Sequence, residues 1–191
     1  MTRLFFAKKY LHLTDPPLLS AFCQKARLIK AAKGTLLARI GEPQNDLAFL
    51  VSGLARAFLP GPKGKDSTDH FIFQPGTALL STFDLERSPA LVSVEALEDC
   101  SFYTLPLTEI QEILTDLSQT DQIYPHLMHG ILTDIWATKF AFQKFSTIKG
   151  RYRWFIQTYP DLAGRVQQKH IASFLGTTPE NLSRIRASLP F

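Results

Sequence analysis

The chain has 191 residues, 45% of them hydrophobic and 20% charged, a balance typical of a soluble globular protein with room for a sizeable core. No run approaches about 18 apolar residues and the first twenty residues lack a signal-peptide core, so we expect no membrane span, no secretion and a cytoplasmic location. The net charge of +4 is uneven, because residues 144–191 hold eight basic and two acidic residues. A basic C-terminal end is typical of a chain that binds a polyanion such as DNA. The alternative is a basic helix surface that only faces solvent.

The first predicted element is a helix within TDPPLLSAFCQKA (residues 14–26). Asp15 is a suitable helix cap, and Pro16 suits the first turn. The apolar residues of the segment repeat at helical spacing, so they would share one buried face.

The next region is poor in helix signals. It consists of short strand-like runs, such as GTLLARI (34–40) and ALVSVEAL (90–97), separated by glycines and prolines. Many short strands with frequent glycine turns predict a β-sandwich, jelly roll or barrel. PGPKGKDST (60–68) offers little to bury and many turn formers, so we expect an exposed hairpin loop there.

Two helices are predicted after the strands, in LTEIQEILTDL (107–117) and YPHLMHGILTDIWATKFAFQKFS (124–146). The longer helix carries two neighbouring apolar stripes. One stripe contains Leu127, Ile131, Ile135, Phe142 and Phe145, and the other contains Met128, Leu132, Trp136 and Phe140. We expect one stripe to pack on the β-domain and the other on a partner subunit, the alternative being a central helix inside a monomer.

The last 45 residues show helical patterns only, and HIASFLGTTPENLSRI (170–185) has the spacing of two short helices around a turn. A helix-turn-helix needs a small residue where the helices cross, and Ala172 is in that place. It also needs a turn residue that tolerates positive φ, and Gly176 follows four residues later. The apolar residues expected to face back into the pair are Ile171, Leu175, Leu182 and Ile185.

The second of these helices has an outward face suited to reading DNA. Thr178 is a good cap, and Glu180 and Arg184 lie four residues apart with Ser183 beside them. In the major groove, Arg184 can bond a guanine in a bidentate manner and Glu180 can accept from a cytosine amino group. The alternative is an exposed Glu–Arg pair that only stabilises the helix by roughly 0.2–0.5 kcal/mol.

These segments together resemble the Crp/Fnr (cyclic-AMP receptor protein) family of bacterial transcription regulators. KGTLLARIGEPQNDLAFLVSGLARAF (33–58) and VEALEDCSFYTLP (94–106) are similar to the strands of its β-roll, and RYRWFIQTYPDLAGRV (151–166) with the helix pair is similar to its C-terminal domain. The resemblance implies an α+β chain. Its parts would be an effector-binding jelly roll at 1–120, a dimerisation helix at 121–146 and a helix-turn-helix DNA-binding domain at 147–191.

The resemblance also implies roles for single residues. In the family a Glu and an Arg four apart read bases, and Glu180 and Arg184 occupy these places. Many members carry another Arg before that Glu, where this chain has Pro179, so that contact is absent. Members usually continue into a β-hairpin wing, whereas ASLPF follows here, so we expect the wing to be missing or vestigial. The candidate DNA-binding residues are Lys169, His170, Thr178, Glu180, Asn181, Ser183, Arg184 and Arg186.

The effector site departs further from the family. Its cyclic-nucleotide binders use a Gly-Glu-Leu-like turn and then an Arg-Ser pair, and the matching stretch here is PGTALLSTFDLERSPALVSVEA. Thr77 stands where the Glu belongs. Counting from Gly76 puts Arg87 in the arginine place, whereas counting back from VSVEAL puts Ser88 there. The candidate effector-binding residues are Gly76, Thr77, Ala78, Leu79, Arg87 and Ser88.

Other chemistries have less support. Asp84 and Glu86 would repel a phosphate, so a cyclic nucleotide is disfavoured against another small molecule or an empty pocket. Cys23 and Cys100 are too few for a four-thiolate iron–sulfur cluster, and the five histidines show no ligand pattern, so we expect no metal site. We find no catalytic constellation and predict no enzyme.

The sequence therefore predicts a homodimeric, sequence-specific regulator of transcription that binds double-stranded DNA under the control of an unknown small-molecule effector. Contact with RNA polymerase is implied by the resemblance, and no membrane association is expected. The alternative function is a cyclic-nucleotide-binding-like regulatory module whose helix-turn-helix no longer reads DNA and which acts on a protein partner.

Overall fold

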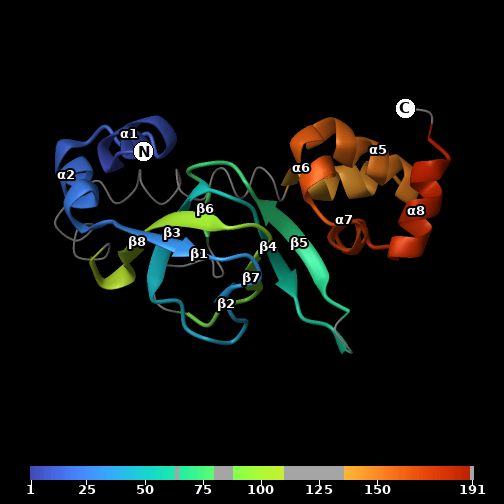
Figure 1. Ribbon diagram of the computed structural model, residues 1–191, viewed down its shortest axis with the longest axis horizontal. Coiled ribbons are helices and arrows are strands. Elements are labelled where there is room, and N and C mark those ends of the chain that lie inside the picture. The colour runs from blue at the N-terminus through green and yellow to red at the C-terminus, as the bar shows by residue number, and fades with distance from the viewer. Residues whose placement is uncertain (63–64, 80–87, 110–135, 190–191) are drawn as a thin grey trace. The chain divides into compact units, whose positions relative to one another are not determined.

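The chain folds into two compact units (Figure 1). The computed structural model describes residues 1–62, 65–79, 88–109 and 136–189. Unit 1 comprises Met1–Ala57 with Phe71–Leu132, and unit 2 comprises Phe58–His70 with Thr133–Phe191. Unit 2 therefore combines the C-terminal part of the chain with a segment from its middle. The expected domain limits after residues 120 and 146 stay predictions.

Two short helices open unit 1, and each begins at a side-chain cap. α1 (Arg3–Tyr10) follows Thr2, whose hydroxyl oxygen accepts from the Phe5 N–H. α2 (Pro16–Lys25) follows Asp15, whose carboxylate accepts from the Leu18 N–H at 3.0 Å. The cap satisfies a backbone donor that the helix itself leaves free. The helix predicted in this segment is thus confirmed with its cap.

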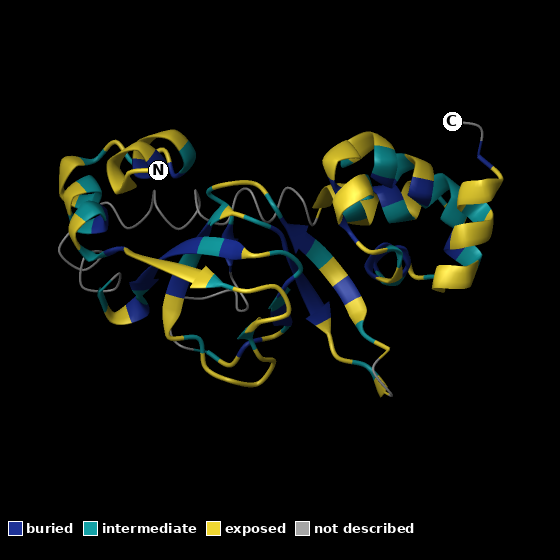
Figure 2. Ribbon diagram, viewed as in Figure 1, coloured by how far each residue is buried: buried dark blue, intermediate teal, exposed yellow. Residues whose placement is uncertain are grey.

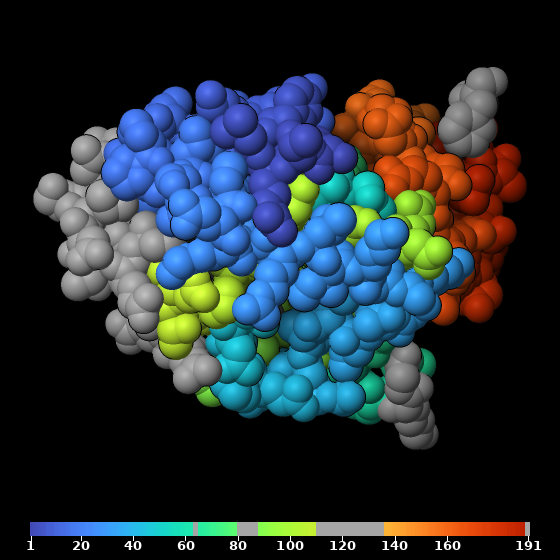
Figure 3. Space-filling model, turned by 60° about the vertical axis from the view of Figure 1, so that its left-hand side comes forward, coloured from blue at the N-terminus to red at the C-terminus, as the bar shows by residue number. Residues whose placement is uncertain are grey.

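Aromatic rings pack these two helices onto the strands. The Phe6 ring of α1 is fully buried, and its centroid lies 5.0 Å from that of Tyr103 and 6.3 Å from that of Phe22 on α2. The Tyr103 hydroxyl donates to the Met1 carbonyl at 2.8 Å. Figure 3 shows α1 and α2, in the darkest blues, next to each other on one face of the unit.

The described strands form two four-stranded sheets. The strands are β1 (Arg27–Ala31), β2 (Leu36–Ala38), β3 (Asp46–Ser52), β4 (Ala55–Leu59), β5 (Ser67–Ile72), β6 (Ala78–Leu79), β7 (Ser93–Ala96) and β8 (Cys100–Pro106). One sheet has the order β1-β8-β3-β6 and the other the order β2-β7-β4-β5. β8 pairs antiparallel with both β1 and β3, and β2 with β7. This arrangement confirms the predicted jelly roll.

The core of the β-roll comes from the buried faces of these strands. Leu50, Ile72, Val94 and Phe102 are at most 2% exposed and belong to one apolar cluster. Removing their apolar surface from water is the main favourable contribution to folding. In Figure 2, β4 is almost entirely dark blue, in agreement with its four buried residues. The predicted loop at 60–68 connects β4 with β5, which already begins at Ser67.

Unit 2 is mainly helical. Its helices are a stretch over residues 136–144, α5 (Ile148–Thr158), α6 (Pro160–Arg165), α7 (Gln168–Leu175) and α8 (Pro179–Ala187). Thr147 caps α5 by accepting from the Gly150 N–H at 3.1 Å, and Pro160 stands in the first turn of α6. Of the two helices predicted before this unit, residues 110–117 and 124–135 lie outside the described residues.

Candidate nucleic-acid interface and effector cavity

The turn between α7 and α8 has the backbone that the sequence predicted. Gly176 ends α7 with φ +73°, and its N–H donates to carbonyls of the last turn. A Cβ at this position would meet only the Arg151 side chain, at 3.9 Å, so the positive φ is the reason for glycine. Thr178 then starts α8, because its hydroxyl oxygen accepts from the Asn181 N–H at 3.2 Å.

The two helices cross through buried small and apolar residues. Ala172, Leu175 and Leu182 are fully buried and Ile171 is 3% exposed, whereas Ile185 is half-buried. An alanine at the crossing lets the backbones approach closely, which fixes the direction in which α8 leaves the turn. The residues expected to face back into the pair therefore lie where the sequence placed them.

Aromatic rings anchor α7 within unit 2. The Phe174 ring centroid lies 5.7 Å from those of Phe142 and Phe155 and 6.5 Å from that of Trp154, with which it is stacked. Aromatic pairs at these separations add to the stabilisation from burial. The cluster joins α7 to α5 and to the helical stretch of residues 136–144.

Arg151 on α5 caps the C-terminal end of the helical stretch over residues 136–144, and this role was not predicted from the sequence. Its guanidinium lies 4.7 Å from the centroid of the Phe142 ring, and its Nε donates to the Phe145 carbonyl at 3.0 Å. A cation at a helix C-terminus satisfies free carbonyls and opposes the helix dipole. The available signal was an arginine five residues after the end of the predicted long helix.

The predicted DNA-binding residues differ in accessibility. Lys169, Thr178, Glu180, Ser183, Arg184 and Arg186 are exposed, Asn181 is half-buried and His170 is 7% exposed. The burial of His170 turns its ring into the unit and away from an approaching ligand. The Asn181 amide donates to the Thr177 hydroxyl at 2.8 Å, so this side chain supports the turn. α8 is largely yellow in Figure 2, and its exposed residues include Glu180, Ser183 and Arg184.

Glu180 is held in its ionised form by its place at the start of α8. Its pKa is lowered from the ordinary value of 4.5, mainly because the carboxylate accepts from its own backbone N–H. The Thr178 hydroxyl also donates to it, and the charge of Arg184 contributes least among the lowering causes. A carboxylate at a helix N-terminus is further favoured by the helix dipole. At neutral pH the face therefore presents an acceptor beside a cation.

A separate cavity lies inside the β-roll of unit 1. It has a volume of about 320 Å³, within the range of small-molecule sites. Its lining combines an apolar floor with polar groups: Ile29, Ala31, Leu37, Ala38, Arg39, Glu42, Pro43, Gln44, Asn45, Asp46, Ala48, Leu79, Ala90, Val94, Phe102 and Thr104. Among the described lining residues, Arg39 is a cation and Glu42 and Asp46 are anions.

The predicted effector residues are scattered relative to this cavity. Leu79 lines it, whereas Gly76, Thr77 and Ala78 are not in the lining, and Ser88 is half-buried. Gly76 packs instead against α1, since a Cβ there would lie 2.8 Å from the Tyr10 Cβ. Arg87 lies outside the described residues.

The polar groups of the cavity come from a turn that the sequence analysis did not single out. Gln44 donates to the carbonyls of Asp46 and Leu79, at 2.9 and 3.2 Å, and so joins the turn to β6. Arg39 and Glu42 form an exposed ion pair at 3.2 Å. The signal available in the sequence was GEPQND, a polar run between two predicted strands.

Two further searches cover only the described part of the chain. Among those residues, no group of three or more His, Cys, Asp or Glu side chains could hold a metal ion. Their helices also include none that is long and apolar enough to cross a membrane. Cys23 and Cys100 are free thiols, and burial is the main cause that raises the pKa of Cys100.

Comparison with known proteins shows which folds the chain resembles. Residues 28–116 match the family model of the cyclic nucleotide-binding domain. FixK2 from Bradyrhizobium japonicum is 18% identical, with a TM-score of 0.70 over 86% of this chain and 84% of that one. The c-di-GMP responsive global regulator CLP from Xanthomonas campestris is 17% identical, with a TM-score of 0.70 over 91% and 90%.

A further solved structure and one curated protein are also similar to this chain. A protein from Eubacterium rectale assigned to the Crp/Fnr family of transcriptional regulators has a TM-score of 0.68 at 18% identity, over 90% of this chain and 81% of that one. Mouse patatin-like phospholipase domain-containing protein 7 is 26% identical over 102 residues, which are 53% of this chain and only 7% of that protein. The likeness to the solved structures is one of fold, and it is to regulatory proteins and not to enzymes.

Proposed function

We propose that this chain, which carries a cyclic nucleotide-binding domain at residues 28–116 and has the fold of Crp/Fnr regulators, is a dimeric transcription regulator that binds DNA through α8. The observation that carries this proposal is the exposed face of Glu180, Ser183 and Arg184 on a helix fixed by the Gly176 turn. The face is chemically suited to base edges, and its helix is held by buried contacts on the other side.

Each exposed residue has a role in this proposal. Arg184 binds guanine O6 and N7, and Glu180 accepts from a cytosine amino group. Lys169 and Arg186 contact phosphates, which supports affinity for any sequence. The net charge of +6 over residues 144–191 favours the approach of this end to DNA. Asn181 and Thr178 act indirectly, because their side chains hold the turn and the start of α8.

A homodimer is supported by the helical stretch over residues 136–144. Trp136 and Phe140 are 53% and 59% exposed, and their ring centroids lie 5.6 Å apart on one side of the helix. Two large adjacent rings in solvent favour burial against a second copy. We expect the double variant Trp136→Glu, Phe140→Glu to sediment as a monomer while Lys144→Glu, from the same helix, sediments as the wild type. A dimeric double variant would exclude this interface.

The effector in this proposal is a small molecule bound in the β-roll cavity. The apolar floor of Val94 and Phe102 suits an apolar group, and the polar turn at Gln44 offers hydrogen bonds to its rim. The acidic balance of the lining disfavours cyclic AMP and any other phosphate. A ligand that stabilises one arrangement of the strands shifts the population of DNA-binding forms. Contact with RNA polymerase belongs to the same proposal.

A second candidate function is a regulatory module that binds a cyclic nucleotide and acts on a protein partner. The observation that favours it is the match of residues 28–116 to the cyclic nucleotide-binding domain. Calorimetry with cyclic AMP and cyclic GMP separates the two functions. Our proposal predicts neither heat of binding nor a thermal shift, and a clear signal with either nucleotide would favour the second candidate.

Selection from random double-stranded DNA with the full chain tests the main proposal. We expect an enriched inverted repeat whose half-sites lie about one helical turn apart, because a symmetric dimer presents two recognition helices. Failure to enrich any motif, in the presence of normally folded dimeric protein, would exclude sequence-specific binding.

A further inference from the structure

The floor of the β-roll cavity is one face of the sheet β1-β8-β3-β6. Phe102 and Thr104 are two residues apart on β8, so their side chains lie on the same face of the strand, and both line the cavity. On the neighbouring strand β3, Asp46 and Ala48 share a face in the same way, and Ala48 is paired directly with Thr104. The floor therefore carries a hydroxyl and a carboxylate beside apolar groups.

The Thr104 side chain is buried, and among the described residues its hydroxyl has no hydrogen-bonding partner. Only 9% of Thr104 is exposed, and no described side chain or backbone group bonds to this hydroxyl. A buried hydroxyl without a hydrogen bond costs free energy, because it gives up the bonds that it makes with water. Buried polar groups in folded proteins are normally paired. A hydrogen bond to a ligand in the cavity would supply the partner.

The cavity also presents a carboxylate that can attract a cation. Of the three charged lining residues, Arg39 and Glu42 neutralise each other in an ion pair at 3.2 Å. Asp46 is exposed, and its carboxylate forms no ion pair or hydrogen bond with any described residue. A carboxylate attracts a cation and repels an anion. The charge of the lining that remains without compensation is therefore negative.

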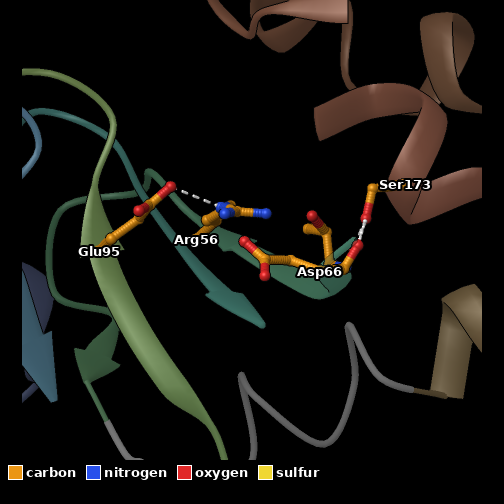
Figure 4. A network of polar contacts seen from close by, with 5 residues as sticks. Arg56, Asp66, Glu95 and Ser173 are labelled. Atoms are coloured by element: carbon orange, nitrogen blue, oxygen red, sulfur yellow. Dashed lines mark hydrogen bonds and ion pairs between the residues drawn. The ribbon is translucent and has the colours of Figure 1, made fainter. Parts of the chain in front are cut away.

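A further carboxylate close to the cavity is already neutralised. Val94 of β7 lines the cavity, whereas its neighbour Glu95 points to the opposite face of the strand. The Glu95 carboxylate accepts from the Nε of Arg56 at 2.7 Å, and the Arg56 side chain is only 4% exposed (Figure 4). Glu95 and Arg56 thus balance each other, and neither changes the charge that Asp46 brings to the cavity.

The hydroxyl and the carboxylate are close enough to share one ammonium group. Asp46 is paired with Pro106 in the β3–β8 ladder, so it is a diagonal neighbour of Thr104. Diagonal neighbours on one face of an antiparallel pair lie roughly 7–8 Å apart. An ammonium group forms hydrogen bonds of about 2.9 Å, so one nitrogen between the two side chains can reach an oxygen of each.

The dimensions of the cavity limit the ligand to a small molecule. Its volume of about 320 Å³ equals that of about ten water molecules, at about 30 Å³ each. Because a water molecule has one non-hydrogen atom, a ligand of about ten such atoms fills the cavity, whereas a nucleotide is larger. Leu79, Val94 and Phe102 suit an apolar body, and a flat ring can pack on the ring of Phe102.

We infer that the β-roll cavity binds a small primary amine with an apolar or aromatic body. The ammonium group lies between the Asp46 carboxylate and the Thr104 hydroxyl, which both accept hydrogen bonds from it, and the body packs on Phe102. The inference rests on the proposed function in taking this cavity as the effector site. Binding of an amine is measured without DNA, so the ligand class and the DNA function can fail separately.

Calorimetry of the full chain with three probes tests the ligand class. Phenethylamine, phenethyl alcohol and phenylacetate combine the same aromatic body with a positive, a neutral and a negative end group. We expect phenethylamine to bind several-fold more tightly than phenethyl alcohol, and phenylacetate not to bind. No binding of phenethylamine, or an affinity no higher than that of either other probe, would overturn the inference.

The substitution Asp46→Asn tests the charged contact, because it removes the charge and keeps the size of the side chain. We expect the affinity for phenethylamine to fall by about two- to five-fold, as for one partly exposed charge pair, while that for phenethyl alcohol stays unchanged. Asp161→Asn removes an exposed carboxylate from unit 2 and is the matched control. An unchanged affinity for the amine, or an equal loss for both probes, would exclude Asp46 as the partner of the ammonium group.

The substitution Thr104→Val tests the hydroxyl, which it replaces with a methyl group. Since the hydroxyl has no partner among the described residues, we expect the melting temperature without ligand to stay the same or to rise. The affinity for phenethylamine should fall about five-fold through the loss of one hydrogen bond. A clearly lower melting temperature would show that the hydroxyl is structural, and an unchanged affinity would show that it does not touch the ligand. Either result contradicts its role.

NMR of the full chain locates the bound probe. We expect phenethylamine to shift the amide signals of Ala48 and Thr104 most strongly and to leave that of Leu162 in unit 2 in place. Shifts confined to residues outside the cavity would overturn the assignment of the site. If the amine binds as expected and DNA selection yields no motif, the proposed DNA function fails and the ligand class stands. If selection succeeds and the amine does not bind, the ligand class fails alone.

Discussion

The α7–α8 pair and the β-roll cavity are built in opposite ways. The contacts of the pair lie within residues 168–187, and its turn, cap and crossing residue follow each other at fixed spacing. The cavity collects residues from Ile29 to Thr104, and its polar turn is tied to β6 by a bond from Gln44 to Leu79 across 35 residues. A helical motif can therefore be predicted from a short stretch of sequence, whereas a cavity built from strands can be identified only in the folded chain.

The largest effect on stability is expected from a substitution on the buried side of the α7–α8 pair. Leu182 is fully buried, so Leu182→Ala should lower the free energy of unfolding of unit 2 by about 2–5 kcal/mol, through lost burial and a residual cavity. Urea unfolding followed by fluorescence measures it, since Trp154 stacks on α7. Ile185→Ala, at a half-buried position, should cost clearly less. Equal costs at both positions would contradict the described packing.

The second prediction concerns the loop that leads to the cavity. Gly76 has φ +91°, and an added Cβ would lie 2.8 Å from both the Tyr10 Cβ and the Tyr10 carbonyl oxygen. We expect Gly76→Ala to lower the free energy of unfolding of unit 1 by about 1–3 kcal/mol or more. Gly34→Ala is the control, because φ is +84° there and nothing lies within 4 Å. Thermal unfolding measures both, and a Gly34 effect as large as that of Gly76 would exclude close packing against α1.

The third prediction concerns the cap of α8. Thr178→Ala removes the acceptor of the Asn181 N–H and should cost about 1 kcal/mol of stability. It also removes a donor to Glu180, so the pKa of Glu180 should rise toward its ordinary value. NMR titration of the Glu180 carboxyl measures this shift. An unchanged titration would mean that the Thr178 hydroxyl does not bond to Glu180.

The lowered pKa of Glu180 sets the pH range in which its ionised carboxylate stabilises the fold. A carboxyl whose pKa is lower in the folded chain stabilises the fold above its ordinary value of 4.5. That stabilisation is lost as the pH falls through the lowered pKa. The stability difference between the wild type and Thr178→Ala should therefore shrink in acid. A difference that grows in acid would have the wrong sign for this account.

The smallest predicted effect is on the salt dependence of DNA binding. Arg186 is exposed on α8, away from the face of Glu180 and Arg184. If it contacts a phosphate, Arg186→Ala should weaken binding to all sequences alike and make the slope of log affinity against log salt shallower by about 1. Titrations at several salt concentrations measure the slope. An unaltered slope would remove Arg186 from the phosphate contacts.

The sequence predicted the parts of the molecule whose contacts are local. The Asp15 cap, the Gly176 turn and the buried Ala172 follow from short-range spacing, and the structure has all three. The strand-rich region predicted a jelly roll because glycine turns mark the strand ends. His170 shows the limit of such reasoning, because its position at the start of the motif suggested a contact whereas its ring is buried.

The long-range contacts could not be predicted from spacing. Nothing local marks Ser173 as a partner of Asp66, which lies 107 residues earlier, or Arg56 as the partner of Glu95. In the sequence, the polar turn at Gln44 has the pattern of an ordinary connection between strands. Its hydrogen bond to Leu79 of β6 is present only in the folded chain. The Arg56–Glu95 and Gln44–Leu79 contacts depend on the order of strands in the sheets, which one sequence does not specify.

The base preference of Arg184→Ala tests the central claim most directly. Its binding is compared with that of the wild type on every single-base variant of the selected site. The account predicts a loss of about 1–3 kcal/mol on the best site and, in each half-site, a preference for one G·C pair that disappears while the others remain. An unchanged preference at every position would contradict the claim that α8 reads DNA through Arg184.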